Sequence, residues 1–340
     1  MKPELYQEYP DPNEAEELEQ LIELTLRTLK RKYLTGPQLR DTHAKGLAVV
    51  RGTFAIEPDL AADLRVGLFR EAKSYKCLLR FSNTDPNPKP DIKKDMRAVS
   101  IKLFGVEGER LWQDDPDAKT LDLLMMSAKT FITPDLRSFI QMQEALLHAY
   151  LEPVKGNAQL VAFFAMHPGT ANRVAHSEIT CANVLELPYF SETAYRFGEK
   201  AVQYKLVPHK KATSQLPEAD APFNYLNQRL REDLAAGDAV FDFMLQFQVD
   251  PVKMPIEDSA VPWDETLSPP VKVATLTLHQ QVVEESALVT TGEHLSFNPW
   301  RTLPEHRPLG WTNRVRQAVY VQVSEFRHRR NSVPVREPRE

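Results

Sequence analysis

The stretch VFDFMLQFQV, residues 240–249, carries the clearest structural pattern in the chain. Apolar residues recur at every second position from Phe241 to Val249, and three of the four residues between them are polar. An alternation with a period of two places the two sets of side chains on opposite faces of a β-strand. The pattern therefore predicts a sheet with one apolar face.

Further segments on both sides of this stretch are also typical of strands, because β-branched and aromatic residues are frequent in them. They are residues 47–56, 78–82, 98–104, 120–126 and 271–280. Gly52 lies inside the first of these segments, where a glycine indicates a bulge or a close approach of another backbone.

Helical spacing of apolar residues predicts four helices, at residues 14–32, 136–150, 225–236 and 312–330. Asn13 and Glu16 are spaced as a capping box at the start of the first helix, and Gly237 is a candidate C-cap for the third. Strands between helices at both ends of the chain favour an α+β fold with an antiparallel sheet.

The composition is that of an ordinary globular protein. The 340 residues are 42% hydrophobic and 26% charged, which excludes wholesale disorder. The net charge of -5 argues against a dedicated nucleic-acid binder. Two cysteines, Cys77 and Cys181, cannot form a disulfide framework and fit a reducing compartment. With no apolar run long enough to span a bilayer and no secretory signal, we expect a cytoplasmic protein.

Common catalytic motifs such as GxGxxG, GxxxxGK[ST], HExxH, GxSxG and CxxC do not occur, and the nine histidines are scattered. Three other strings carry chemistry. In the first, RDTHAKG (residues 40–46), His43 at the entry to a strand is a candidate acid/base group beside an anion site formed with Arg40. The alternative is a partly exposed histidine in a basic turn.

The second string is LRFSN, residues 79–83. In a strand, Arg80 and Ser82 share one face and Phe81 points to the other. An inward-facing Arg80 requires an anionic partner, because a buried unpaired charge is costly. The alternative places Arg80 and Ser82 at the surface, with Phe81 in the core.

The third string is RQAVY, residues 316–320, in the last predicted helix. Steps of four and seven residues place Arg316, Tyr320 and Arg327 on one stripe. A nearby cation favours the phenolate form of tyrosine, and tyrosine is a known proximal ligand of haem iron. The alternative is an amphipathic helix with a solvated basic face and a partly buried Tyr320. For residues 327–330, a solvated helix end is favoured over a nucleic-acid or anionic-membrane contact, because cations there complement the helix dipole.

Taken together and in this order, the three strings resemble motifs of the haem catalase superfamily. Arg40, His43 and Gly46 are similar to the segment that presents the distal histidine, and residues 80–82 resemble its Arg-Phe-Ser strand. DMRAVSIKLF, residues 95–104, is similar to another strand of the family. Arg316 and Tyr320, followed by Arg327, resemble the proximal ligand helix.

The resemblance implies a closed antiparallel β-barrel with flanking helices and a buried haem b. Residues 1–36 are then an N-terminal helical arm, 37–311 the barrel core with helical insertions, 312–332 the proximal ligand helix and 333–340 a loose tail. It implies Tyr320 as the iron ligand, Arg316 as its charge partner, and His43, oriented by Ser82, as the distal acid/base. The remaining implied haem contacts are the propionate partners Arg40, Arg80 and Arg327, and Phe139 against the haem face.

Two departures from the family pattern concern the distal side. Met126 and Ser127 occupy the place of the family's distal asparagine, and Ser127 could replace part of its hydrogen bonding. Thr42 precedes His43, and a hydroxyl residue at this position is similar to the pattern of the coral allene oxide synthase branch. Both departures argue against rapid dismutation of hydrogen peroxide.

We therefore expect a small catalase-related haem peroxidase that acts on organic or lipid hydroperoxides and takes electrons from an unidentified donor. One alternative is a fatty-acid hydroperoxide isomerase or dehydratase, and another is a non-enzymatic haem-binding or haem-sensing protein. We expect no nucleic-acid partner. A peripheral membrane contact, if the substrate is a lipid, and a homodimer stay as alternatives.

Overall fold

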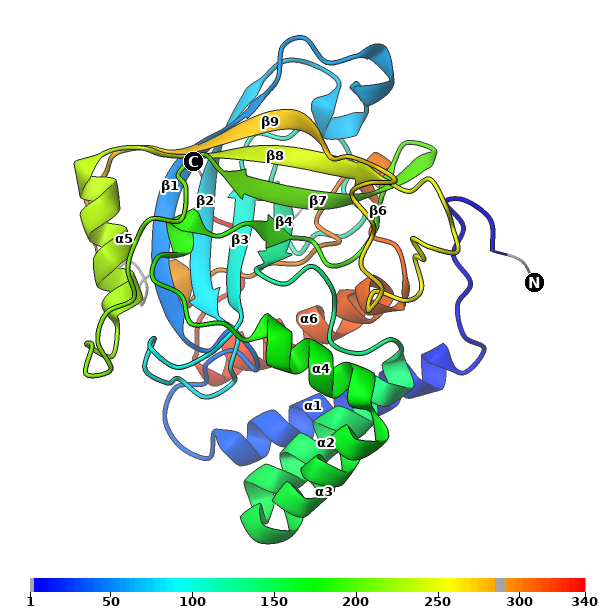
Figure 1. The fold of residues 1–340 in the computed structure, drawn as a ribbon, viewed down its shortest axis with the longest axis vertical. Coiled ribbons are helices and arrows are strands. Elements are labelled where there is room, and N and C mark those ends of the chain that lie inside the picture. The colour runs from blue at the N-terminus through cyan, green and yellow to red at the C-terminus, as the bar shows by residue number, and fades with distance from the viewer. Residues whose placement is uncertain (1–2, 116, 285, 287–290, 340) are drawn as a thin grey trace.

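The computed structural model describes residues 3–115, 117–284, 286 and 291–339. In this part of the chain, nine strands form a single antiparallel sheet (Figure 1). They are β1 (Gly46–Ile56), β2 (Ser74–Asn83), β3 (Arg97–Leu103), β4 (Leu121–Met126), β5 (Tyr189–Phe190), β6 (Tyr195–Phe197), β7 (Lys200–Pro208), β8 (Ala239–Phe247) and β9 (Val271–Leu278).

The sheet closes on itself into a barrel. Its strand order is β5-β4-β3-β2-β1-β9-β8-β7-β6, and β5 also pairs with β7. This pairing joins the two sides through Tyr189 and Leu206, so that eight strands form the closed ring and β6 lies outside it. The expected closed antiparallel barrel in an α+β fold is thus confirmed.

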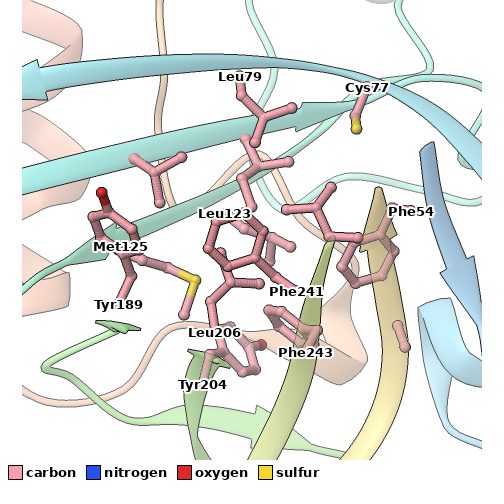
Figure 2. Close-up of a cluster of buried hydrophobic side chains, with 14 of the residues drawn as sticks. Phe54, Cys77, Leu79, Leu123, Met125, Tyr189, Tyr204, Leu206, Phe241 and Phe243 are labelled. Atoms are coloured by element: carbon pink, nitrogen blue, oxygen red, sulfur yellow. The ribbon is translucent and has the colours of Figure 1, made fainter. Parts of the chain in front are cut away.

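Apolar side chains fill the barrel interior (Figure 2). Phe241 and Phe243 of β8 are fully buried, and the Phe243 ring contacts the Phe54 ring of β1 edge-on at 5.1 Å between centroids. The alternation predicted for residues 240–249 is therefore right over most of its length. It is wrong at Val249, which is 50% exposed because the strand ends at Phe247.

Gly52 marks a close approach between strands rather than a bulge. A Cβ atom at this position would lie 2.7 Å from the backbone oxygen of Thr277 in β9. The register shift in the pairing of β1 with β2 lies elsewhere, between Gly46 and Ala48. Of the two predicted explanations for Gly52, the structure therefore supports the close approach.

Six α-helices flank the barrel in the described residues. They are α1 (Glu14–Lys32), α2 (Leu136–Leu151), α3 (Pro153–Met166), α4 (Pro168–Ser177), α5 (Tyr225–Ala236) and α6 (Trp311–Arg330). Helix α5 covers one flank of the barrel, and α6 runs beneath its lower end beside α1 (Figure 1). Leu21, Leu136 and Trp311 belong to one apolar cluster that joins α1, α2 and α6.

Details of the predicted helices differ. The Asn13 side chain makes no capping hydrogen bond and contacts Asp11 instead, so the predicted capping box is absent. Gly237 follows α5 as expected, but its φ of 174° is extended rather than left-handed. Helices α3 and α4 were not predicted, although each has a proline in its first turn, where proline is favoured.

The C-terminal segment, expected to be a loose tail over residues 333–340, is anchored at Glu337, while residues 334–336 and 339 are exposed. Glu337 is 5% exposed and contacts Lys102 at 2.7 Å and Arg301 at 3.0 Å. Both cations also pair with the buried Asp122. Asp114 adds a further contact to Arg301 at 3.0 Å. A buried ion network therefore ties the tail to β3 and β4.

We expect Lys102→Met to lower the free energy of unfolding by about 3–5 kcal/mol, because removing one partner leaves buried charge without compensation. Lys102 is fully buried, and Asp122 and Glu337 would then share Arg301 as their cation. Urea denaturation measures the loss. The matched control is Lys119→Met, which breaks only an exposed ion pair with Glu107 and should change stability little. Equal effects of the two substitutions would contradict the expectation.

Candidate active site

His43 lies in the loop before β1 and contacts β2. Its Nδ1 atom is 3.1 Å from the Ser82 hydroxyl oxygen, and its backbone N–H donates to Thr84 at 3.1 Å. The His43 carbonyl accepts from Arg80 at 3.0 Å. His43 also has a φ of 60°, a left-handed conformation that is uncommon outside glycine. The ring and the backbone are therefore both held, and Ser82 occupies the orienting position expected for it.

The environment keeps the His43 imidazole neutral. Burial and then the positive charges of Arg80, Arg40 and Arg316 lower its pKa to about 3. With Nδ1 engaged by Ser82, the remaining ring nitrogen, Nε2, is the one available to exchange a proton with a ligand. Arg316, on helix α6, makes the smallest of these contributions to the lowered pKa of His43.

This pKa predicts how stability depends on pH. The folded pKa of His43, about 3, lies below the unfolded value of 6.5, so the unfolded chain binds more protons between them. The free energy of unfolding therefore falls as the pH drops below 6.5. By pH 5, His43 accounts for a decrease of about 2 kcal/mol. We expect His43→Gln to lack this loss in urea denaturation at pH 7 and pH 5. His279→Gln, at an exposed histidine, is the control. A His43→Gln protein with the wild-type pH dependence would contradict the burial argument.

Arg80 and Ser82 are buried, so the surface alternative for these residues is wrong. Arg80 is 3% exposed and Ser82 is 2% exposed. Phe81, on the opposite face of β2, is 1% exposed in the apolar core. The Arg80 Nε atom is buried without a hydrogen-bond partner, while its Nη2 atom contacts Glu293 at 3.2 Å.

Arg40, Arg80 and Arg327, which we call the arginine triad, converge on one short segment. Arg40 contacts the Glu293 carboxylate at 3.0 Å, and Arg327 donates to the Glu293 carbonyl. Arg327 is 3% exposed, and His328 is buried beside it. A solvated helix end is therefore wrong for these two residues and right only for Arg329 and Arg330, which are exposed. The structure brings the three predicted arginines together.

Arg316 and Tyr320 form a pair on α6. The Arg316 Nε atom donates to the Tyr320 hydroxyl at 2.9 Å, and the guanidinium carbon lies 5.0 Å from the centre of the tyrosine ring. Although burial alone would lower the pKa of Arg316, the neighbouring Tyr320 and Tyr195 raise it, so the guanidinium stays charged. A charged donor therefore holds the phenol oxygen of Tyr320 in place.

The remaining predicted site residues are Ser127, Thr42 and Phe139. Ser127 accepts a hydrogen bond from the Arg97 backbone N–H at 3.0 Å. Thr42 is exposed in the loop that carries His43. Phe139 lies on α2, where its ring packs against Phe131 at 5.4 Å and Trp311 at 6.3 Å between centroids.

Two acidic residues near the site were not predicted. Glu293 lies in a turn without a periodic pattern, so the sequence offers no signal for its position on the arginine triad. Glu192, between β5 and β6, is 6% exposed with a φ of 59°. Burial raises its pKa well above the ordinary value, and Arg316 opposes this rise.

In the described residues, no cluster of three or more His, Cys, Asp or Glu side chains is suited to a metal ion. Among the same residues, no helix combines the length and apolarity that crossing a membrane requires.

No protein-family model and no curated protein matches the sequence, but solved structures match the fold. A fungal catalase superposes with a TM-score of 0.68 at 18% identity, over 89% of this chain and 61% of that one. The fold is catalase-like. Catalase A from Saccharomyces cerevisiae gives a TM-score of 0.63 at 18% identity, over 89% of this chain and 63% of that one. A bacterial catalase gives 0.63 at 16% identity, over 96% and 67%.

The catalase-like chain described here therefore spans about two thirds of the length of these catalases. At 16–18% identity, the similarity establishes the fold and not the activity. On a fold that many activities share, the residues of the site decide the function.

Proposed function

We propose that the protein is a haem-dependent peroxidase that reduces organic or lipid hydroperoxides and dismutates hydrogen peroxide weakly or not at all. The observation that carries this proposal is the arrangement at the barrel end. His43 is half-buried and held by Ser82, and the charge of Arg316 helps to lower its pKa, while Arg316 itself donates to the Tyr320 hydroxyl on α6.

The residues at this place fit haem b. The Tyr320 hydroxyl, with Arg316 at 2.9 Å, is a donor suited to ferric iron. The arginine triad provides three guanidinium groups for two propionates, and planar guanidinium is well matched to carboxylate. Buried Arg80 keeps its Nε donor without a partner, so the triad has unused hydrogen-bonding capacity. We assign Tyr320 as the iron ligand and the triad as the propionate site.

Bound haem supplies the redox chemistry that cleaves the O–O bond. The role of His43 is proton transfer: Nε2 takes the proton of the hydroperoxide and returns it to the leaving oxygen, which therefore departs without a full negative charge. Ser82 keeps the ring in place through Nδ1. Reducing the hydroperoxide to an alcohol and water consumes two electrons and two protons, which an organic electron donor must supply.

The distal side supports weak dismutation. The Ser127 hydroxyl accepts from the Arg97 backbone N–H, so part of its hydrogen-bonding capacity is used within the sheet. Met126 offers no donor that could replace an asparagine amide. Hydrogen peroxide consequently finds fewer hydrogen-bond partners at this place. A larger apolar hydroperoxide depends less on such partners, so its binding is weakened little.

Turnover by the haem-reconstituted protein tests the proposal. Cumene hydroperoxide and a fatty-acid hydroperoxide are supplied with and without guaiacol, and products are identified by mass spectrometry. We expect guaiacol-dependent turnover to the alcohol and slow oxygen release from hydrogen peroxide. Rapid oxygen release would indicate a true catalase, and no turnover by haem-loaded protein would indicate a binding or sensing role.

A second candidate function is isomerisation or dehydration of a fatty-acid hydroperoxide, favoured by the hydroxyl of Thr42 next to His43. This reaction needs no electron donor. Conversion of the fatty-acid hydroperoxide to an isomer or an allene oxide at the same rate without guaiacol would establish it and overturn the peroxidase assignment.

A further inference from the structure

The turn at residues 292–295 lies directly on the arginine triad. The Glu293 carboxylate contacts Arg40 at 3.0 Å and Arg80 at 3.2 Å. Arg40 also donates to the carbonyls of Gly292 at 2.8 Å and Leu295 at 2.7 Å. Arg327 donates to the carbonyls of Glu293 and of Leu295. The protein therefore places one of its own carboxylates on two guanidinium groups of the triad, and backbone carbonyls of the same turn hold the third.

The single negative charge of the Glu293 carboxylate does not balance the positive charges of the three arginines. Burial and then the charges of Arg80 and Arg327 lower the pKa of Arg40 well below its usual value. Burial also lowers the pKa of Arg327 to about 10, with Glu293 opposing and Arg80 adding to the shift. Arg80 is 3% exposed and keeps an unpartnered Nε. The triad can therefore bind more negative charge than Glu293 provides, because part of its positive charge is uncompensated and one of its donors is unused.

Glu293 can leave the triad without unfolding the turn around it. Its side chain is 23% exposed, whereas Arg80 beneath it is 3% exposed. The backbone carbonyls of residues 292, 293 and 295 hold Arg40 and Arg327 independently of the carboxylate. A rotation of the Glu293 side chain towards solvent therefore frees Nη1 of Arg40 and removes the carboxylate from Nη2 of Arg80, while these carbonyl contacts persist.

We propose that Glu293 is a built-in competitor for the arginine triad and that a ligand must bring its own carboxylates to displace it. Glu293 then determines specificity. A flat ring with two carboxylates binds by displacing the Glu293 carboxylate, whereas a ring without carboxylates obtains no binding energy from the triad. The inference rests on the proposed function for the identity of the ligand as a porphyrin.

Iron-free protoporphyrin IX and its dimethyl ester test this inference without iron ligation or turnover. Porphyrin fluorescence gives the dissociation constant of each for the full-length protein and for Glu293→Gln. We expect the substitution to tighten binding of protoporphyrin IX about tenfold and to leave the dimethyl ester unchanged. Glu293→Asp, which keeps the charge on a shorter side chain, should give an intermediate gain and serves if the glutamine variant does not fold.

The matched control is Glu305→Gln, which removes a carboxylate from an exposed ion pair with Arg70 and should change neither constant. Weaker binding of protoporphyrin IX by the Glu293 variants would overturn the inference, because Glu293 would then assist the arginines. An equal gain for both porphyrins would also overturn it. If the wild-type protein binds neither porphyrin, the proposed haem function fails as well.

Discussion

Tyr320→Phe should abolish the tyrosinate-type ferric spectrum of the haem-reconstituted protein and lower peroxidase activity by at least ~100-fold. The basis for the magnitude is that changing residues around a metal ligand already costs about 10–100-fold, and losing the ligand costs no less. Phenylalanine keeps the ring of Tyr320 over the Arg316 guanidinium but removes the oxygen to which Arg316 donates. Absorption spectroscopy and a guaiacol assay measure the two losses.

Two controls accompany this variant. Tyr150→Phe makes the same change at a half-exposed tyrosine on α2 and should leave spectrum and activity unchanged. Circular dichroism should show that Tyr320→Phe keeps the fold, because the hydroxyl of Tyr320 has its partner in Arg316 on the same helix. An unaltered haem spectrum in Tyr320→Phe would show that another residue holds the iron.

His43→Ala should retain haem yet slow O–O cleavage by about 10²–10⁴-fold, the usual share of a positioned acid/base group. The haem contacts assigned to Tyr320 and the arginine triad do not include the His43 ring, so haem affinity should change little. Stopped-flow mixing with cumene hydroperoxide measures the cleavage step separately from the reaction with the electron donor.

Ser82→Ala distinguishes proton transfer from general disruption of the site. It removes the 3.1 Å contact to Nδ1 but leaves the His43 backbone held by Thr84 and Arg80. We expect a smaller decrease than for His43→Ala, because the base remains but is less well oriented. Full cleavage activity in His43→Ala would refute the acid/base role.

Local sequence pattern predicts much of the barrel and several helices. Strand β8 follows from a period of two and α1 from helical spacing, because burial on one face imposes each pattern. Strand β7 carries the same signal, since Val202, Tyr204 and Leu206 are buried and alternate with half-buried polar residues. Strand β7 was not predicted, although its sequence has the pattern of a strand with one buried face.

Barrel closure and the site depend on contacts between distant residues. The β5–β7 pairing involves only two residues of β5, too few to show a period. Glu337 and Lys102 are 235 positions apart, and nothing local marks the tail as buried. Glu293 meets Arg40 and Arg80 only after the chain has folded around them. The three arginines could be anticipated from motifs, but their internal carboxylate partner could not.

A crystal structure of the haem-loaded protein would show which side chain holds the iron and which residues contact the propionates. We expect iron bonded to the Tyr320 oxygen, the His43 ring on the opposite face of the haem, and both propionates on Arg40, Arg80 and Arg327. Haem bound elsewhere, or iron held by a different side chain with Tyr320 turned away, would contradict this expectation.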